Sequence, residues 1–96
     1  MKPADARAAN RPAIRRVVEA HHARNPRVFG SVLRGEGTDA SDLDLLVDPM
    51  PGMTLFNVGA ICHELGELLG VPVDVATPNA LPDRTREQIL AEAEPV

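Results

Sequence analysis

The sequence predicts a small mixed α/β (α+β) domain in which helices flank a short mixed central sheet. Segments with helical periodicity alternate with short apolar segments that have the periodicity of strands. Dipeptides that contain a proline separate several of these segments, as at Asn25-Pro26 and Pro51-Gly52. The chain has 96 residues, 44% of them apolar and 25% charged. We therefore expect a single domain over residues 1–96 with a modest core.

The first part of the chain predicts a helix followed by a strand. Apolar residues recur at helical spacing over residues 11–24. Pro26 ends this helix, because the residue before a proline disfavours the helical region. We expect a short strand at residues 27–30. A brief helical turn at residues 31–35 then leads into a glycine-containing loop through Ala40.

A second strand is predicted over residues 42–48, and its two faces differ. Side chains alternate along a strand, so one face carries three apolar residues and the other carries two aspartates and a leucine. The apolar set is Leu43, Leu45 and Val47, and the opposite set is Asp42, Asp44 and Leu46. The pattern indicates one face toward the core and one face available for chemistry.

The rest of the chain predicts a helix, a strand and a helix. The long apolar stripe of the first of these helices lies between a capping Thr54 and a terminating Gly70. Residues 71–76 form the third strand, whose proline places its start at an edge or an irregular position. The last helix covers residues 83–93.

We expect that last helix to pack through Ile89 and Leu90. The predicted order is helix, strand, strand, helix, strand, helix. In this arrangement the helices pack mainly on one side of the sheet.

The composition argues against several classes of function. With two phenylalanines and no tyrosine or tryptophan, the chain has few aromatic faces on which single-stranded nucleic acid could stack. A net charge of −4 also disfavours direct nucleic-acid binding. Cys62 is the only cysteine, which excludes an internal disulfide and a cysteine-rich zinc site. No apolar stretch reaches the length of a membrane span, so we expect a cytoplasmic protein without membrane contact.

Three aspartates are the candidate catalytic and metal-binding residues. Asp42 and Asp44 lie on one face of the second predicted strand, roughly 6.6 Å apart along it. Asp74 lies midway along the third, so the three carboxylates converge if the two strands pair. Carboxylates that close repel one another, and Mg²⁺ relieves the repulsion by binding carboxylate oxygens together with substrate phosphates. Two such ions about 3.5–4 Å apart clamp the attacking and leaving oxygens of an in-line nucleotidyl transfer.

A Gly-Ser step upstream of these aspartates predicts a phosphate-binding turn. Gly30 lets the backbone approach a phosphate closely because it has no Cβ. Ser31 offers a hydroxyl and an amide N–H at the start of the next turn. Arg34 lies one turn further on, where it can meet a phosphate or pair with a carboxylate.

These residues resemble the active-site pattern of a known superfamily. The pattern is Gly30-Ser31, Arg34-Gly35, Ser41-Asp42-Leu43-Asp44 and Asp74. It resembles that of the DNA polymerase β-like nucleotidyltransferases, and the short length and the segment VDVATPNAL resemble their minimal nucleotidyltransferase branch. That branch includes antitoxins encoded beside HEPN-domain toxins. The resemblance extends from about Val28 to Pro95 and implies the nucleotidyltransferase fold.

The resemblance also implies roles for the matching residues. Gly30 and Ser31 bind the triphosphate in the family. The Asp42 and Asp44 positions hold the metal. Asp74 matches a third carboxylate that helps hold the metal and activates the incoming hydroxyl. Besides Gly30 and Ser31, the predicted nucleotide-binding set contains Arg34 and Ser41.

We therefore expect a Mg²⁺-dependent enzyme that moves a nucleoside monophosphate, AMP from ATP, onto a hydroxyl. The acceptor we expect is a HEPN-type toxin, which this chain would neutralise as an antitoxin. The alternative from another class is a binding module that neutralises its partner by contact alone. A weaker alternative is an enzyme that modifies a small molecule such as an aminoglycoside. The alternatives without a catalytic or binding role are that the Asp-x-Asp residues form a solvated strand face, that Asp74 is a surface residue of an edge strand, and that Arg34 forms a surface ion pair.

Overall fold

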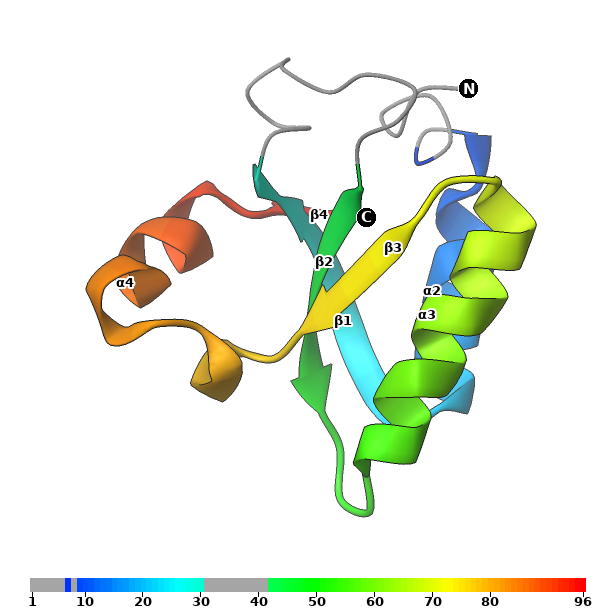
Figure 1. Cartoon of the computed structure of the whole chain (residues 1–96), viewed down its shortest axis with the longest axis horizontal. Helices are drawn as coiled ribbons and strands as arrows, with labels where there is room; N and C mark the ends of the chain where they lie inside the picture. The colour runs from blue at the N-terminus through cyan, green and yellow to red at the C-terminus, as the bar shows by residue number, and fades with distance from the viewer. Residues whose placement is uncertain (1–6, 8, 31–41) are drawn as a thin grey trace.

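A four-stranded mixed sheet forms the centre of the structure, a computed structural model that describes residue 7, residues 9–30 and residues 42–96. Helices and a short 3-10 helix flank the sheet on both sides (Figure 1). The elements in chain order are α2 (Arg11–Ala20), β1 (Ala23–Phe29), β2 (Leu43–Pro49), α3 (Leu55–Leu69), β3 (Val73–Ala76), η2 (Pro78–Ala80), α4 (Asp83–Glu92) and β4 (Glu94–Pro95). The predicted fold class is confirmed, and the element order is as predicted apart from the additional η2 and β4. The expectation that the helices pack mainly on one side is wrong, because η2 and α4 lie on the face opposite α2 and α3 (Figure 1).

The strand order is β3-β2-β1-β4. β1 pairs antiparallel with both β2 and β4, whereas β2 and β3 run parallel. The parallel pair is joined through α3, as parallel neighbours require a crossover connection. This topology places the end of β1 beside the beginnings of β2 and β3. In the register, Phe29 is the partner of Asp44, and Asp44 is the partner of Asp74.

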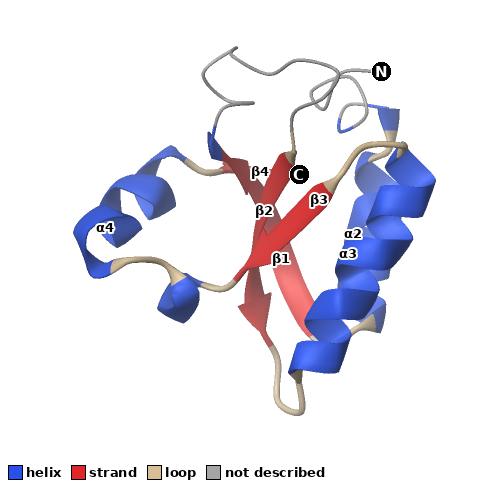
Figure 2. Ribbon diagram, viewed as in Figure 1, coloured by secondary structure: helices blue, strands red, loops and turns tan. Residues whose placement is uncertain are grey.

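Helices α2 and α3 cover one face of the sheet, and the hydrophobic core lies beneath them (Figure 2). The predicted apolar face of β2 is buried there, and the predicted helix stripes pack against it. The core side chains with no exposed surface include Ile14, Val18, Val28, Leu43, Leu45, Val47, Ile61 and Leu65. Each large apolar side chain buried in this way stabilises the fold by about 1.5–3 kcal/mol.

The opposite face of the sheet has a thinner cover, formed by η2 and α4 (Figure 2). Leu46 of β2 is fully buried on this face, outside the main core cluster. α4 contributes no buried residue: Ile89 is half-buried, whereas Leu90 is 40% exposed. The prediction that α4 packs through both residues is therefore wrong for Leu90. Successive helix positions point in different directions, so one face of a helix rarely buries both.

The junction of α2 and β1 differs from the prediction. The helix ends at Ala20 rather than at residue 24, and the strand begins at Ala23 rather than at residue 27. His22 and Asn25 have positive φ angles of 60° and 54°, which reverse the chain and start the pairing with β2. Pro26 lies in the irregularity between Arg24 and Arg27, where the missing N–H of a proline is tolerated.

Both ends of α3 agree with the prediction. The backbone N–H of Thr54 donates to Oδ1 of Asn57 at 2.8 Å, which fixes the first turn. Gly70 follows the last helical residue in the left-handed conformation, with φ of 70°, and its N–H donates to the carbonyl of Gly66. Among the described residues, no helix combines the length and apolar character that crossing a membrane requires.

Candidate active site

The predicted carboxylates lie at one end of the sheet, where β1 ends and β2 and β3 begin. Asp44 and Asp74 are register partners on neighbouring parallel strands, so their side chains leave the same face. Asp42 immediately precedes β2. Gly30 immediately follows β1, next to the Phe29 that pairs with Asp44. Two strands and the end of a third therefore assemble this end of the sheet from segments far apart in the sequence.

Asp42 and Asp74 are in direct contact. The hydrogen bond between their side chains is the largest cause that raises the pKa of Asp74, followed by partial burial and by the negative charge of Asp42. A hydrogen bond between two carboxyl groups requires a proton on one of them. The pair therefore holds a proton at a pH where an isolated aspartic acid has already lost it, the behaviour of like charges that share one site.

Asp44 lies against Gly30. The φ angle of Gly30 is +83°, and a Cβ built on it would lie 2.5 Å from Oδ2 of Asp44. A side chain at this position would meet both a strained backbone and the carboxylate. The structure thus gives position 30 a reason to be glycine that the sequence argument did not contain, namely the close approach of Asp44.

The described residues include no group of three His, Cys, Asp or Glu side chains close enough to hold a metal ion. The contact pair is Asp42 and Asp74, and the carboxylate of Asp44 faces Gly30. Mg²⁺ is commonly bound by one or two carboxylates plus substrate phosphates. The chemistry of this donor set fits such an ion, because a cation can take the place of the shared proton. A metal cage built by protein alone does not fit.

Three predicted nucleotide-binding residues lie outside the described residues. They are Ser31, Arg34 and Ser41. Gly30 is the last described residue before this segment, and Asp42 is the first described residue after it. The phosphate-binding role of the Gly-Ser step therefore stays a prediction.

Asp48 has a structural environment. Its carboxylate accepts hydrogen bonds from Arg27 at 2.7 Å and from Asn25 at 3.1 Å. Burial alone would raise the pKa of Asp48, but these two hydrogen bonds and the charges of Arg27 and Arg24 outweigh it, and the pKa is lowered. Asp48 thus joins β1 to β2 on the carboxylate face as a paired ion.

Cys62 is half-buried in α3, as its position on the apolar stripe predicted. Burial is the main cause that raises the pKa of its thiol. A nucleophilic cysteine needs a lowered pKa, so the structure favours a packing role for this residue.

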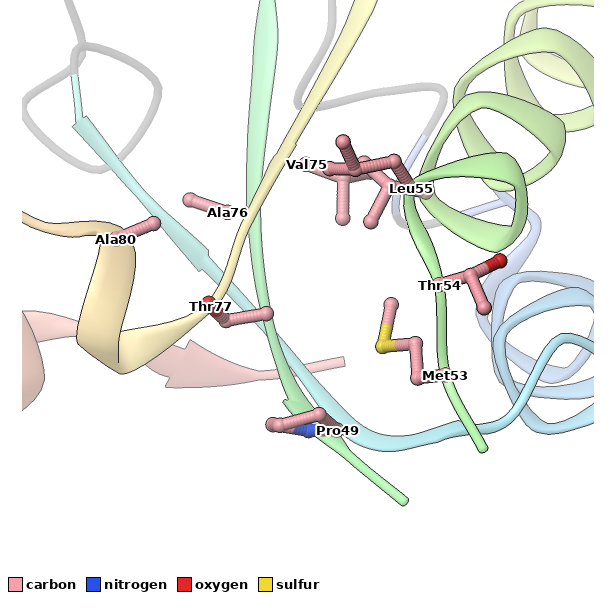
Figure 3. A pocket seen from close by; sticks show the side chains of 9 residues that line it. Pro49, Met53, Thr54, Leu55, Val75, Ala76, Thr77 and Ala80 are labelled. Atoms are coloured by element: carbon pink, nitrogen blue, oxygen red, sulfur yellow. The ribbon is translucent and has the colours of Figure 1, made fainter. Parts of the chain in front are cut away.

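An apolar cavity lies remote from the carboxylates. It has a volume of 370 Å³ and lies between the start of α3 and the far ends of β2 and β3. Its walls are mainly apolar, and Figure 3 shows Met53 and Leu55 on one side with Val75, Ala76 and Ala80 on the other. The carboxylates lie at the opposite ends of the same strands, so cavity size alone does not locate the active site.

A smaller groove of 240 Å³ lies beside Gly30. Phe29 and Gly30 line it from β1, and Thr85, Gln88, Ile89 and Glu92 line it from α4. No functional role was predicted for these α4 residues from the sequence. Their spacing of three, four and seven positions does place them on one helix face, and this was the only available signal.

Comparison with known proteins places this geometry in a family. Residues 14–96 match the family described as "Nucleotidyltransferase domain". The chain belongs to this family. The matched segment contains every predicted site residue of this nucleotidyltransferase, from Gly30 to Asp74.

A curated relative and two solved structures support the assignment. "Putative protein adenylyltransferase MJ0435" of Methanocaldococcus jannaschii is 37% identical over 73 residues, which cover 76% of this chain and 78% of the relative. A structure described as a "putative minimal nucleotidyltransferase" has a TM-score of 0.85 and 43% identity, over 97% of this chain and 95% of the other. This similarity confirms the nucleotidyltransferase fold.

The second solved structure is described as a toxin-antitoxin with AMP-PNP. It is 17% identical to this nucleotidyltransferase, with a TM-score of 0.74 over 90% of this chain and 71% of the other. At this identity the likeness concerns the fold.

Proposed function

We propose that this nucleotidyltransferase transfers AMP from ATP to a hydroxyl group of a partner protein in a Mg²⁺-dependent reaction. The partner we propose is a HEPN-type toxin, which the modification silences. The observation that carries the proposal is the side-by-side placement of Asp44 and Asp74, with Asp42 hydrogen-bonded to Asp74 and Gly30 against Asp44. This is the donor set that a metal-assisted nucleotidyl transfer needs.

Each residue has a part in the proposed reaction. The acceptor hydroxyl oxygen attacks the α-phosphorus of ATP, the bond to the β-phosphate oxygen breaks, and pyrophosphate leaves. Asp74 takes the hydroxyl proton, the part that the resemblance to the nucleotidyltransferases implies for the third carboxylate. The Asp42–Asp74 pair, with Asp44 on the neighbouring strand and the oxygens of the triphosphate, would hold Mg²⁺, which when bound would stabilise negative charge on the attacking and leaving oxygens.

A protein acceptor is favoured by the name of the relative and by the composition. The Methanocaldococcus jannaschii relative is named as a protein adenylyltransferase, and the toxin-antitoxin neighbour is described with an ATP analogue. A net charge of −4 disfavours a nucleic-acid acceptor. AMP attached to a tyrosine hydroxyl of the toxin adds bulk and negative charge, which would repel RNA phosphates from a cleavage site.

The test is to incubate the protein with a HEPN-type toxin, ATP and Mg²⁺ and to weigh the toxin by mass spectrometry. We expect the added mass of AMP with the wild type and none with the Asp42→Asn, Asp44→Asn double variant. Asp48→Asn is the matched control, because it removes a carboxylate from the same face away from the proposed metal, and it should retain transfer. Unmodified toxin under all conditions would reject the enzymatic proposal.

A second candidate, neutralisation by contact alone, is favoured by an exposed apolar surface. Leu55 and Phe56 at the start of α3 are 88% and 90% exposed, and Leu55 also lines the 370 Å³ cavity. Exposed apolar surface beside a cavity is typical of protein interaction sites. Full neutralisation of the toxin by the double variant, without any added mass, would support this candidate over the enzyme.

A further inference from the structure

The groove between β1 and α4 has two unlike walls. Phe29 and Gly30 form the wall at the end of β1. The other wall is one face of α4, from which Thr85, Gln88, Ile89 and Glu92 project. Phe29 is one of only two phenylalanines in the chain. The groove therefore combines an aromatic side chain, a half-buried aliphatic one and three polar ones.

The groove adjoins the carboxylates directly. Gly30 lines the groove and also lies against the carboxylate of Asp44. Phe29 is the register partner of Asp44 and lies on the same face of the sheet. A molecule whose phosphates lie at Gly30 thus has this groove as its immediate neighbour.

The size and charge of the groove select which part of a nucleotide can enter. Its 240 Å³ is below the roughly 300–1,000 Å³ of pockets that enclose a whole drug-sized ligand. It therefore suits a single ring system. Glu92 is the only charged residue among the described residues that line the groove. Its negative charge disfavours the triphosphate there and leaves the uncharged base as the fitting part.

The amide of Gln88, an exposed side chain, is oriented by a hydrogen bond within α4. Its Nε2 donates to Oε1 of Glu92 at 3.2 Å. A carboxylate accepts hydrogen bonds and cannot donate them, so the amide must turn its NH₂ toward Glu92. The Gln88 carbonyl oxygen and a second N–H remain for a ligand. An adenine edge offers the complementary donor and acceptor, which glutamine pairs with in a bidentate manner.

We propose that this groove is the base-binding subsite of the nucleotidyltransferase and that it takes a purine. Phe29 and Ile89 hold the ring, and Gln88, oriented by Glu92, recognises the amino edge of adenine. The inference rests on the proposed use of a nucleoside triphosphate. It adds the element that distinguishes one base from another.

The test compares three probes in the presence of Mg²⁺ by titration calorimetry: ATP, inosine triphosphate and inorganic tripolyphosphate. Inosine triphosphate replaces the amino group of adenine by oxygen at nearly unchanged size, and tripolyphosphate has no base. We expect the wild type to bind ATP about 5- to 100-fold more tightly than inosine triphosphate, as one bidentate pair implies. Gln88→Ala should bring the two nucleotides close to equal affinity and leave tripolyphosphate unchanged.

Two further variants separate recognition of the base from damage to the helix. Phe29→Leu should weaken both nucleotides by a similar factor, because it removes the stacking face and keeps apolar bulk. Glu87→Ala is the matched control on α4, since Glu87 is exposed and outside the groove lining. It should change none of the three affinities.

The outcomes distinguish this inference from the proposed function. An unchanged preference for ATP over inosine triphosphate in Gln88→Ala, with ATP still bound, would overturn the base subsite and leave the proposed function standing. A wild type that binds neither nucleotide nor tripolyphosphate would overturn the proposed function and this inference with it.

Discussion

One face of β2 places Leu43, Leu45 and Val47 in a core that α2 and α3 cover. The other face carries Asp44 and Asp48, and of the described helices only η2 and α4 lie over it (Figure 2). Apolar packing on the first face stabilises the fold. On the second face, carboxylates that lie close together lower the stability unless a proton, a cation or an arginine compensates them. The comparison teaches that stability and chemistry are divided between opposite faces of the same strand.

The largest effect on stability is expected from substitutions on the core face of β2. Leu45 and Leu46 are adjacent and both have no exposed surface, but Leu45 belongs to the main core cluster and Leu46 does not. Leu45→Ala should lower the free energy of unfolding by about 2–5 kcal/mol. Leu46→Ala should cost less within that range, because the thin cover can collapse onto the space. Urea denaturation measures the free energy of unfolding of both variants. Equal losses of free energy would show that the helices on the two faces of the sheet pack equally well.

The largest effect on the opposite face should concern activity rather than stability. Asp44→Asn removes a proposed metal ligand, and transfer of AMP should fall by about 100-fold or more. The melting temperature should stay the same or rise, since one negative charge beside Asp74 is lost. Calorimetry and the mass-spectrometric assay measure the two quantities. An Asp44→Asn protein with full Mg²⁺-dependent activity would contradict the assignment.

At Gly30, a substitution should lower both the stability of the fold and the affinity for the nucleotide. Gly30→Ala puts a Cβ at a φ of +83° and against the Asp44 carboxylate, so it should cost about 1–2 kcal/mol of stability and also weaken nucleotide binding. Gly52→Ala is a matched control, because Gly52 also has a positive φ, of +90°. A Cβ built on Gly52 lies 3.9 Å from Nδ1 of His22, so it meets no close contact. Gly52→Ala should show the loss of stability alone. Equal nucleotide affinities for the two variants would contradict a special role for Gly30.

Local signals predicted the parts of the fold that depend on neighbouring residues. The alternation in β2 and the caps of α3 at Thr54 and Gly70 are contained in short segments, and the structure confirms them. The end of α2 depends on the positive φ at His22, which the pairing of β1 with β2 imposes. β4 has only two residues and is defined by its pairing with β1. A segment this short has no periodicity from which a strand could be predicted.

The candidate site was predictable to a similar extent. Strand alternation placed Asp42 and Asp44 on one face, and the parallel register then brings Asp44 beside Asp74. The contact between Asp44 and Gly30 depends on where β1 ends in space, which spacing along the chain does not reveal. Gln88 was not predicted as a site residue because it is an exposed polar residue on a helix, and only the position of α4 beside β1 places it at the groove.

The paired carboxylate Asp48 should produce a smaller, pH-dependent effect. Its pKa in the folded state lies below the ordinary value of 3.8, so its stabilising contribution is fully present well above pH 3.8 and is lost as the pH falls through the lowered pKa. The partly exposed ion pair with Arg27 is worth about 0.2–1 kcal/mol. Asp48→Asn should remove this loss below pH 4 in urea denaturation at several pH values, with AMP transfer unchanged. An identical acid dependence in the variant would contradict the ion pair.

The smallest effect on stability should come from Phe56, which lies on neither face of the sheet. Its side chain is 90% exposed, so Phe56→Ser should change the free energy of unfolding by less than about 0.5 kcal/mol. The affinity for ATP with Mg²⁺ should also stay the same, because the start of α3 lies at the opposite end of the sheet from Asp42. If the exposed apolar surface contacts the toxin, the same variant should bind the toxin more weakly. Glu67→Ser, an exposed substitution elsewhere on α3, serves as the control in the binding assay. Equal toxin affinity for the two variants would exclude this surface from the contact and leave the interface to other parts of the domain.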